Sequence, residues 1–337
     1  MCIRDSYIVG GAVRDSLMGR TPTEFDMTTN LEGKIVRMLF PDAKLVHPPG
    51  YQIFHFKRGE YSFELARMRR DIDYSGRHSQ VEFTDELKED LTRRDFTVNA
   101  LAYDFQKKEI IDLFEGKKDI ANRIIRSIGD PVVRFQEDKL RMLRAIRFAA
   151  KLNFKLAKDV EEAIKRLSPQ LLLLSSELIR RELDRMLKGK YRLRAVGLLN
   201  KTSIFLKLFS IRLDKKRLAL VVRSLYYLYK YQADLIISYA TILYWCQKKI
   251  EAINLFLKKD ERKLLNYLLS SVSPLFHFLS GEERMEIVQI VENPHFGLLV
   301  TMAEALMYGG RKNPKLLRGR IKIKLPGLDA PPLMGGD

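Results

Sequence analysis

Residues 7–29, YIVGGAVRDSLMGRTPTEFDMTT, have the pattern of a strand, a glycine pair, a short helix and a second strand. Side chains alternate between the two faces of a strand, so we expect Glu24, Asp26 and Thr28 on one side. Two carboxylates held this close repel each other unless a cation lies between them. Hard divalent cations take oxygen ligands, and Mg²⁺ usually uses one or two carboxylates together with substrate phosphates. The second strand therefore predicts a Mg²⁺ site formed by Glu24 and Asp26.

The glycine pair Gly10-Gly11 lies between the first strand and the helix. Glycines allow backbone N–H groups to approach a phosphate at the start of a helix. A glycine pair or an acid pair alone is common on solvated surfaces, but both together favour a nucleoside triphosphate site. Two-metal phosphoryl transfer commonly uses a further acid. Glu64, in the strand-like run 61–68, is the candidate if that run pairs with the first motif.

Composition narrows the class of protein. The chain has 337 residues, of which 46% are hydrophobic, enough for two or three domains with real cores. A net charge of +18 favours a polyanionic partner, with nucleic acid ahead of a membrane surface. Cys2 and Cys246 show no paired spacing, which argues against a zinc site or disulfides and predicts a cytoplasmic protein. The longest uncharged apolar run, 235–246, falls short of the roughly 20 residues that span a membrane.

The pattern of the chain changes near Gly116. Short β-rich runs dominate residues 7–112, whereas apolar spacings of three and four residues, typical of helices, follow Gly116. The segment 311–324 holds seven basic residues and no acid, so it is either a solvated tail or an RNA contact. The opening MCIRDS and the closing APPLMGGD predict that both termini are truncated.

Four ordered blocks resemble one family, the class II tRNA nucleotidyltransferases and bacterial poly(A) polymerases of the DNA polymerase β superfamily. The resemblance implies an α+β protein with a polymerase β-like nucleotidyltransferase head, a mixed sheet with helices, over residues 1–125. An all-α neck that selects the nucleotide would cover 126–190, and an all-α body with a basic tail that binds RNA would cover 191–337. The blocks that carry the resemblance are YIVGGAVRDSLMGRTPTEFDMTT, EDLTRRDFTVNALAYD (89–104), GKKDIANRIIRSIGDPVVRFQEDKLRMLRAIRFAAKLNF (116–154) and SSELIRRELDRML (175–187).

The resemblance also implies roles for individual residues. Asp26 matches the second acid of the family's metal pair, and Glu24 stands where the first is normally Asp. With Glu64 these acids form the expected catalytic set, of which Glu24 and Asp26 would bind metal. In the RRD motif, residues 93–95, arginine suits phosphate and a carboxylate suits ribose hydroxyls. The full nucleotide-binding set that the resemblance implies is Gly10, Gly11, Arg14, Asp15, Arg94, Asp95, Asn99, Asp138, Arg141 and Arg144.

The motif EDKLR, residues 137–141, suggests how a base is chosen. Residues three apart share a face of a helix, so Asp138 and Arg141 can point together at one base. Aspartate accepts and arginine donates hydrogen bonds. Cytosine and adenine both place an amino donor beside a ring-nitrogen acceptor, whereas guanine and uracil reverse that order. The pair is thus predicted to admit C and A and to reject G and U, and the alternative is an ordinary helix salt bridge. In the following helix we expect ion pairs from Glu177, Arg181 and Glu182.

The favoured function is template-independent transfer of CMP and AMP from CTP and ATP to the 3′ end of tRNA, by two-metal-ion chemistry with Mg²⁺. The expected partners are the tRNA 3′ end, CTP and ATP, with no membrane and no obligate protein partner. Within the family, a poly(A) polymerase or an enzyme that adds only CC or only A are alternatives. From another class, the chain could be an RNA-binding paralogue with impaired catalysis, an alternative suggested by Glu24.

Overall fold

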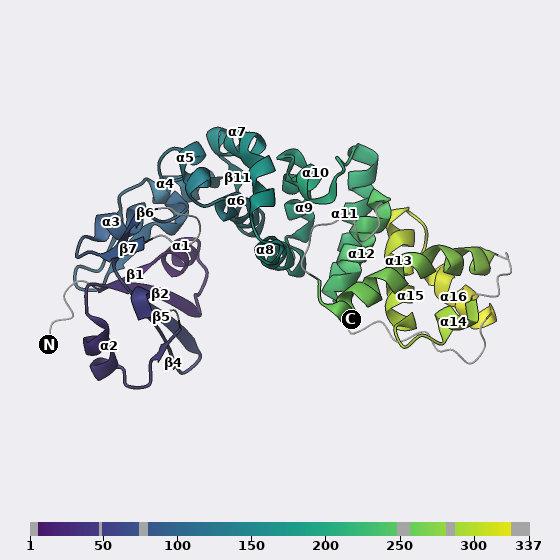
Figure 1. Ribbon diagram of the computed structural model, residues 1–337, viewed down its shortest axis with the longest axis horizontal. Coiled ribbons are helices and arrows are strands. Elements are labelled where there is room, and N and C mark those ends of the chain that lie inside the picture. The colour runs from purple at the N-terminus through teal and green to yellow at the C-terminus, as the bar shows by residue number, and fades with distance from the viewer. Residues whose placement is uncertain (1–5, 47–48, 74–79, 248–256, 281–286, 325–337) are drawn as a thin grey trace. The chain divides into compact units, whose positions relative to one another are not determined.

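The computed structural model describes residues 6–46, 49–73, 80–247, 257–280 and 287–324 (Figure 1). The chain forms two compact units, Met1–Leu167 and Ser168–Asp337. This division falls inside the segment expected to be the neck. The expected boundaries at 125 and 190 therefore stay a prediction.

The first unit contains all the strands that the structure describes, together with seven α-helices. Its strands are β1 (Ser6–Val9), β2 (Glu24–Thr29), β3 (Lys44–Leu45), β4 (Ile53–Arg58), β5 (Tyr61–Arg67), β6 (Arg69–Asp73), β7 (Gln80–Phe83), β8 (Leu101–Asp104), β9 (Glu109–Asp112), β10 (Ile124–Ile125) and β11 (Lys155–Leu156). Its helices are α1 (Gly11–Leu17), α2 (Gly33–Leu39), α3 (Leu87–Thr92), α4 (Gly116–Asn122), α5 (Pro131–Glu137), α6 (Leu140–Leu152) and α7 (Lys158–Leu167).

The main sheet has the strand order β3-β4-β5-β2-β1-β8-β9. The pair β2 and β5 is parallel, and every other neighbouring pair in this sheet is antiparallel. The sheet is therefore mixed, and the expected α+β class is confirmed. The order of strand, short helix and strand expected for residues 7–29 is confirmed, and β2 pairs with β1 in the antiparallel sense.

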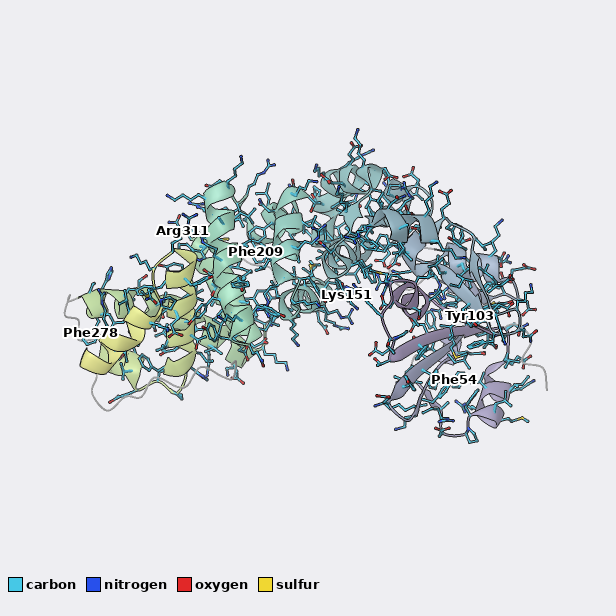
Figure 2. The ribbon with its side chains drawn as sticks, turned by 180° about the vertical axis from the view of Figure 1, so that it is seen from behind. Phe54, Tyr103, Lys151, Phe209, Phe278 and Arg311 are labelled. Carbon is cyan, nitrogen blue, oxygen red and sulfur yellow. The ribbon has the colours of Figure 1, made fainter. Side chains whose placement is uncertain are left out.

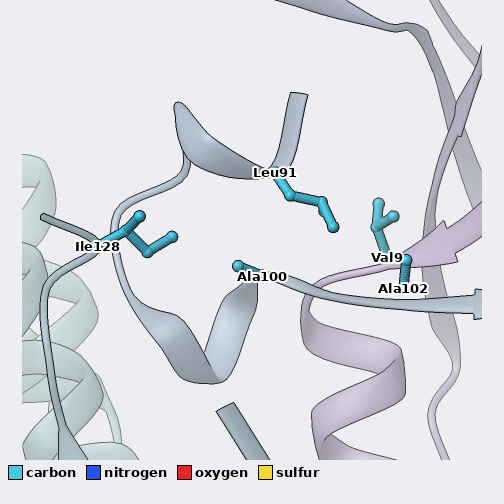
Figure 3. Close-up of a cluster of buried hydrophobic side chains, with 5 residues drawn as sticks. All are labelled: Val9, Leu91, Ala100, Ala102 and Ile128. Carbon is cyan, nitrogen blue, oxygen red and sulfur yellow. The ribbon is translucent and has the colours of Figure 1, made fainter. Parts of the chain in front are cut away.

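Alternation along β2 separates an apolar face from an acidic one. Met27 packs with the buried cluster of Val36, Phe54, Phe56 and Leu65. The Asp26 side chain points to the opposite face of the sheet, which also carries the side chain of its register partner Val9. Val9, in β1, belongs to a second buried cluster (Figure 3). The other members are Leu91 in α3, Ala100 and Ala102 at the start of β8, and Ile128 shortly before α5. The acid pair is thus anchored by apolar packing on both faces of the sheet.

One detail of the expected neck differs. Strand β11, in a region expected to be helical throughout, pairs in parallel with β10. Asn153 adopts a left-handed conformation (φ 59°) that ends α6, and the chain then continues in extended form. Apolar spacing does not reveal such a short strand, because two residues are too few to display a period.

The second unit contains only helices among its described residues. They are α8 (Ser176–Lys188), α9 (Arg192–Lys201), α10 (Ile204–Phe209), α11 (Lys215–Lys230), α12 (Leu235–Cys246), α13 (Lys259–Ser280), α14 (Ile287–Val291), α15 (Phe296–Gly309) and α16 (Lys315–Lys324). Each unit has its own core: Phe54 in the first and Phe209 in the second, both labelled in Figure 2, are each only 2% exposed. Over the described ranges, no helix is both long and apolar enough to cross a membrane.

Candidate functional site

Three acids share one face of the sheet. In the parallel pair of β2 and β5, Asp26 lies opposite Glu64 and Glu24 lies opposite Ser62. The pairing on which a role for Glu64 depended is therefore present. Within the described residues, however, no three Asp, Glu, His or Cys side chains are gathered closely enough to hold a metal ion. The face offers two neighbouring carboxylates on β2, which suits a cation that takes its remaining ligands from substrate and water.

The electrostatics around Asp26 favour a positive ligand. Burial raises the pKa of the Asp26 carboxyl, and the neighbouring Glu24 raises it further, while Arg94 and Arg14 lower it. The net pKa lies above the ordinary value, so the charged carboxylate is incompletely compensated by the protein. A divalent cation would supply that compensation. The residues present therefore fit a metal ion at Glu24 and Asp26.

Gly10 keeps the space beside Asp26 open. Its backbone has a φ of +72°, which favours glycine, and its N–H donates to the Leu101 carbonyl at 3.0 Å. A Cβ at this position would lie 3.1 Å from Nη1 of Arg94 and 3.6 Å from Oδ2 of Asp26. Any larger residue would thus fill the gap between the acid and the arginine, where a triphosphate is expected.

Arg94 faces this gap with unused hydrogen-bonding capacity. Its Nη2 is 3.4 Å from Oδ2 of Asp90, a long contact, and its buried Nε has no partner among the described residues. Asp90 itself is fully buried and accepts shorter bonds from Arg93, at 2.8 and 3.0 Å. Asp90 therefore fixes the start of the RRD motif and leaves Arg94 able to bind an anion.

A buried chain of hydrogen bonds connects the glycine-rich helix to α6. Arg14, in α1, donates through Nη1 to Oδ1 of Asn99, and through Nε to Asp15 at 2.9 Å. Asn99 donates through Nδ2 to Oδ1 of Asp95 at 3.1 Å. Arg144, in α6, donates to Oδ2 of Asp95 at 2.8 and 2.5 Å. Five residues of the expected nucleotide-binding set are thus brought together.

Asp95 is the ionised acceptor that holds this network of hydrogen bonds together. Burial would raise its pKa, but Arg144 and the hydrogen bond from Asn99 outweigh that effect and lower it. Asp95 therefore stays ionised at neutral pH. Both of its carboxylate oxygens already accept bonds from the protein, including one from the Phe96 N–H at 2.9 Å. The expected contact of Asp95 with ribose stays a prediction.

Asp138 and Arg141 do not share a helix, and that premise was wrong. Helix α5 ends at Glu137, Asp138 is extended (φ −134°, ψ 103°), and α6 begins at Leu140. The Asp138 carboxylate accepts from the Leu140 N–H at 2.9 Å, so it caps the start of α6. Arg141 is 8% exposed and donates to Glu137 at 2.8 Å. The break arises because the Asp138 side chain competes for the backbone donor that a continuous helix would use.

Arg134, which sequence reasoning missed, holds the backbone of the RRD motif. Its Nη2 lies 2.8 Å from the carbonyls of both Arg93 and Arg94, and its Nη1 donates to Glu137 at 2.5 Å. Arg141 adds a bond to the Arg93 carbonyl at 3.2 Å and shares Glu137 as its counter-ion. The sequence contained a signal for this arrangement. Arg134, Glu137 and Arg141 lie three and four residues apart, which is the spacing of charge pairs on helices.

Phe148, also missed, lies among three arginines. Its ring centroid is 5.7 Å from the guanidinium of Arg14, 5.6 Å from that of Arg144 and 4.3 Å from that of Arg147. The ring is 9% exposed and packs edge-on against Phe96. Cation–π contacts of this kind hold guanidinium groups in place without neutralising them. The cluster therefore fixes the position of Arg14, whose charge acts to lower the pKa of Asp26.

In the second unit, the expected ion pairs of the SSELIRRELDRML helix are present. Arg181 pairs with Glu177 on the exposed surface, and Arg185 pairs with the buried Glu182 at 2.8 Å. Both pairs join residues within α8 itself. Their role is therefore local stabilisation of that helix.

Comparison with known families agrees with the fold and with this site. Residues 6–126 match the model of the poly(A) polymerase head domain, and residues 153–212 match a model described as the probable RNA and SrmB-binding site of polymerase A. The first unit therefore carries a nucleotidyltransferase head domain, of a family that generally uses divalent metal ions. The chain belongs to the family of class II tRNA nucleotidyltransferases and bacterial poly(A) polymerases.

Relatives with names support the same assignment. The CCA-adding enzyme of Bacillus licheniformis is 37% identical over 232 residues, which are 68% of this chain and 58% of that enzyme. That of Bacillus subtilis is 40% identical over 202 residues, 59% of this chain and 50% of that enzyme. The crystal structure of the Bacillus stearothermophilus CCA-adding enzyme in complex with CTP is 28% identical, with a TM-score of 0.72 over 95% of this chain and 78% of that chain. The chain thus spans about half the length of the curated relatives that it matches.

Proposed function

We propose that the chain transfers CMP and AMP from CTP and ATP to the 3′ end of tRNA, without a template. The observation that carries the proposal is the acid pair on β2, open at Gly10 and faced by Arg94. The Bacillus stearothermophilus relative binds CTP, and a CCA-adding enzyme of Thermotoga maritima, which shares the fold at 22% identity over 96% of this chain and 79% of that chain, with a TM-score of 0.73, is complexed with tRNA. These likenesses support the same substrates for this chain.

The metal in this proposal is Mg²⁺, held by Glu24 and Asp26 in two-metal-ion chemistry. When bound, Mg²⁺ would stabilise the charge that develops on the reacting and leaving oxygens of phosphoryl transfer. The chain's own residues bind and orient the nucleotide. Arg94 binds the triphosphate through Nη1, the nitrogen that lies at the opening beside Gly10, and Gly10 leaves room for the phosphates. Arg144, held by its ion pair with Asp95, belongs to the nucleotide-binding set in this proposal.

The proposal assigns base choice to Asp138 and Arg141. For Asp138, substitution by asparagine is a more specific test than substitution by alanine. We expect Asp138→Asn to lower the preference for C and A over G and U by about tenfold, since a matched hydrogen-bonding pair is worth roughly 1–3 kcal/mol of discrimination. Asparagine replaces an obligate acceptor by a mixed group, yet it still caps α6. Single-nucleotide incorporation with each of the four triphosphates measures the effect. Unchanged preference in both Asp138→Asn and Arg141→Ala would remove the assignment.

The activity itself is tested by incubating the protein with tRNA that lacks its 3′ end and with each labelled triphosphate in turn. We expect CTP and ATP to be incorporated, and GTP and UTP to be rejected. Long tails of A on unrelated RNA would instead identify a poly(A) polymerase, and use of only CTP or only ATP would identify a partial enzyme. Absence of any incorporation, with RNA still bound, would identify an impaired paralogue.

A further inference from the structure

The second unit has a cavity that no part of the proposed reaction uses. It measures about 250 Å³ and lies where the end of α11, the end of α15 and the start of α16 meet. This volume is below the roughly 300–1,000 Å³ of sites for drug-sized ligands, so it suits a single small ring system. The side chains that line it include Tyr226, Tyr227, Tyr231, Tyr308, Lys230 and Glu304.

The cavity is held by a close approach of two helices. A Cβ on Gly309, in α15, would lie 2.0 Å from Oγ of Ser224 and 2.9 Å from the Leu220 carbonyl, both in α11. Only glycine permits this contact, which Arg223 reinforces by donating to the Gly309 carbonyl at 2.7 Å. Beyond this point the tyrosines of the two helices face each other. The geometry of the cavity is therefore fixed by backbone packing.

The tyrosine rings form a set of aromatic surfaces around the cavity. The ring of Tyr308 lies 6.3 Å from that of Tyr226, at an interplanar angle of 30°, and 5.5 Å from that of Tyr227. Tyr231, directly after the end of α11, lies 4.6 Å from Tyr227. Tyr226 and Tyr308 are 44% and 37% exposed, so these two rings can be reached from solvent. Exposed aromatic rings of this kind provide stacking surfaces for unpaired bases.

Charge is divided between the interior and the edge of the cavity. Glu304 is 1% exposed and accepts a hydrogen bond from the Tyr227 hydroxyl at 3.1 Å. A carboxylate has about four lone-pair sites and can accept several hydrogen bonds at once. Lys230 and Lys315 line the same cavity. A buried acceptor with lysines nearby suits a ligand with N–H donors at one end and a phosphate at the other.

We propose that this cavity binds one unpaired nucleotide of an RNA strand. The base lies among the tyrosines with its N–H edge at Glu304, and the flanking phosphates lie at Lys230 and Lys315. Guanine fits best, because its pairing edge places an N–H and an amino group side by side, whereas the other bases place an acceptor beside their donor. A cationic amine would also suit tyrosines and a carboxylate, but the two lysines oppose it. The proposal rests on the proposed function only in taking RNA as the partner.

The stacking surface is tested with a matched pair of tyrosines on α11. Tyr226→Leu removes a ring that lines the cavity, whereas Tyr229→Leu removes one that is similarly exposed, at 39%, but lies outside it. We expect Tyr226→Leu to weaken binding of an RNA pentamer with a central guanine by on the order of tenfold, and Tyr226→Phe to restore it. Tyr229→Leu should bind as the parent does. Equal binding by Tyr226→Leu and Tyr229→Leu would overturn the proposal.

The recognition of guanine is tested with pentamers that differ only in the central base. The parent should bind UUGUU more tightly than UUUUU, UUCUU and UUAUU, and Glu304→Gln should lose that order. Because Glu304 is buried, the thermal midpoint of the variant is measured alongside, and Lys315→Ala provides a second variant at an exposed position. Loss of one phosphate contact should reduce the slope of log K against log salt concentration by about 0.7. An unchanged order in Glu304→Gln together with an unchanged slope in Lys315→Ala would refute the assignment.

These outcomes are independent of the proposed reaction. Binding of GMP alone as tightly as the pentamer would assign the cavity to a free nucleotide, and tighter binding of spermidine would assign it to an amine; either result overturns the RNA proposal. Cavity variants should still incorporate CTP and ATP at saturating tRNA, because none of these residues belongs to the first unit. If the parent incorporates no nucleotide but the pentamer results hold, the reaction fails and the cavity assignment stands.

Discussion

Asp26→Ala is expected to abolish nucleotide incorporation, with a loss of at least about a thousandfold. The metal contributes several kcal/mol of charge stabilisation to phosphoryl transfer, and each 1.36 kcal/mol corresponds to tenfold in rate. Asp26 is the acid at the opening that Gly10 leaves opposite Arg94, where a Cβ on Gly10 would lie 3.6 Å from Oδ2 of Asp26 and 3.1 Å from Nη1 of Arg94. Turnover at several Mg²⁺ concentrations measures the loss. Rescue of Asp26→Ala by high Mg²⁺ would contradict its role as an essential ligand.

Glu24 provides the graded control for this experiment. Glutamate keeps both oxygens of aspartate but adds one methylene, so it reaches a metal only by shifting the ion or bending the chain. A misplacement of about 1 Å can cost on the order of 100-fold in rate. Glu24→Asp should therefore preserve or raise turnover, and Glu24→Ala should remove most of it. If Glu24→Ala equals the parent throughout, the metal depends on Asp26 with another acid, such as its register partner Glu64.

The stability of the same variants separates lost chemistry from lost folding. The folded-state pKa of Asp26 lies above its ordinary value, chiefly because of burial, so ionised Asp26 costs stability at neutral pH in the absence of metal. That cost decreases as pH falls through the folded-state pKa, where the carboxyl takes up its proton. Asp26→Asn, which cannot ionise, should thus keep or raise the thermal midpoint of the metal-free protein while remaining inactive.

The sequence was a reliable guide where a local pattern determines the structure. Alternation along Glu24–Thr29 predicted the shared face of the acids, and the glycine pair predicted the turn into α1. The parallel pairing that places Glu64 opposite Asp26 could be named only as a condition, because register between distant strands depends on packing of both faces of the sheet.

Features that depend on tertiary packing could not be read in the same way. A helical spacing assigned Asp138 and Arg141 to one face, but the Asp138 side chain bonds the Leu140 N–H and separates two helices. Phe148 was not singled out from the sequence, since nothing in its neighbourhood predicts that Arg14 would come within 5.7 Å of its ring. The division at Leu167 likewise follows from how helices pack, and no glycine- or proline-rich linker marks it.

Arg134→Ala should give the largest loss of stability among single changes near the site, about 3 kcal/mol. The side chain is 8% exposed, and its removal leaves the carbonyls of Arg93 and Arg94 without their shared donor and Glu137 with only Arg141 as counter-ion. Breaking a buried pair by removing one partner typically costs 3–5 kcal/mol, and here the remaining arginine keeps the loss near the lower end. Urea unfolding monitored by circular dichroism measures it.

Two further variants test whether stability depends on the planar guanidinium group of Arg134 or only on its charge. Arg134→Lys keeps the charge but cannot donate to Glu137 and to two carbonyls in one plane, so it should recover less than half of the loss. Arg58, paired with Asp42 at 2.6 Å on the exposed surface, is the matched control, and Arg58→Ala should leave the free energy of unfolding close to that of the parent. Because Arg134 holds the backbone from which Arg94 projects, Arg134→Lys should also raise KM for the triphosphate more than it lowers kcat. Two results would contradict this role of Arg134. One is a loss of stability in Arg134→Ala no greater than in Arg58→Ala, and the other is an unchanged KM in Arg134→Lys.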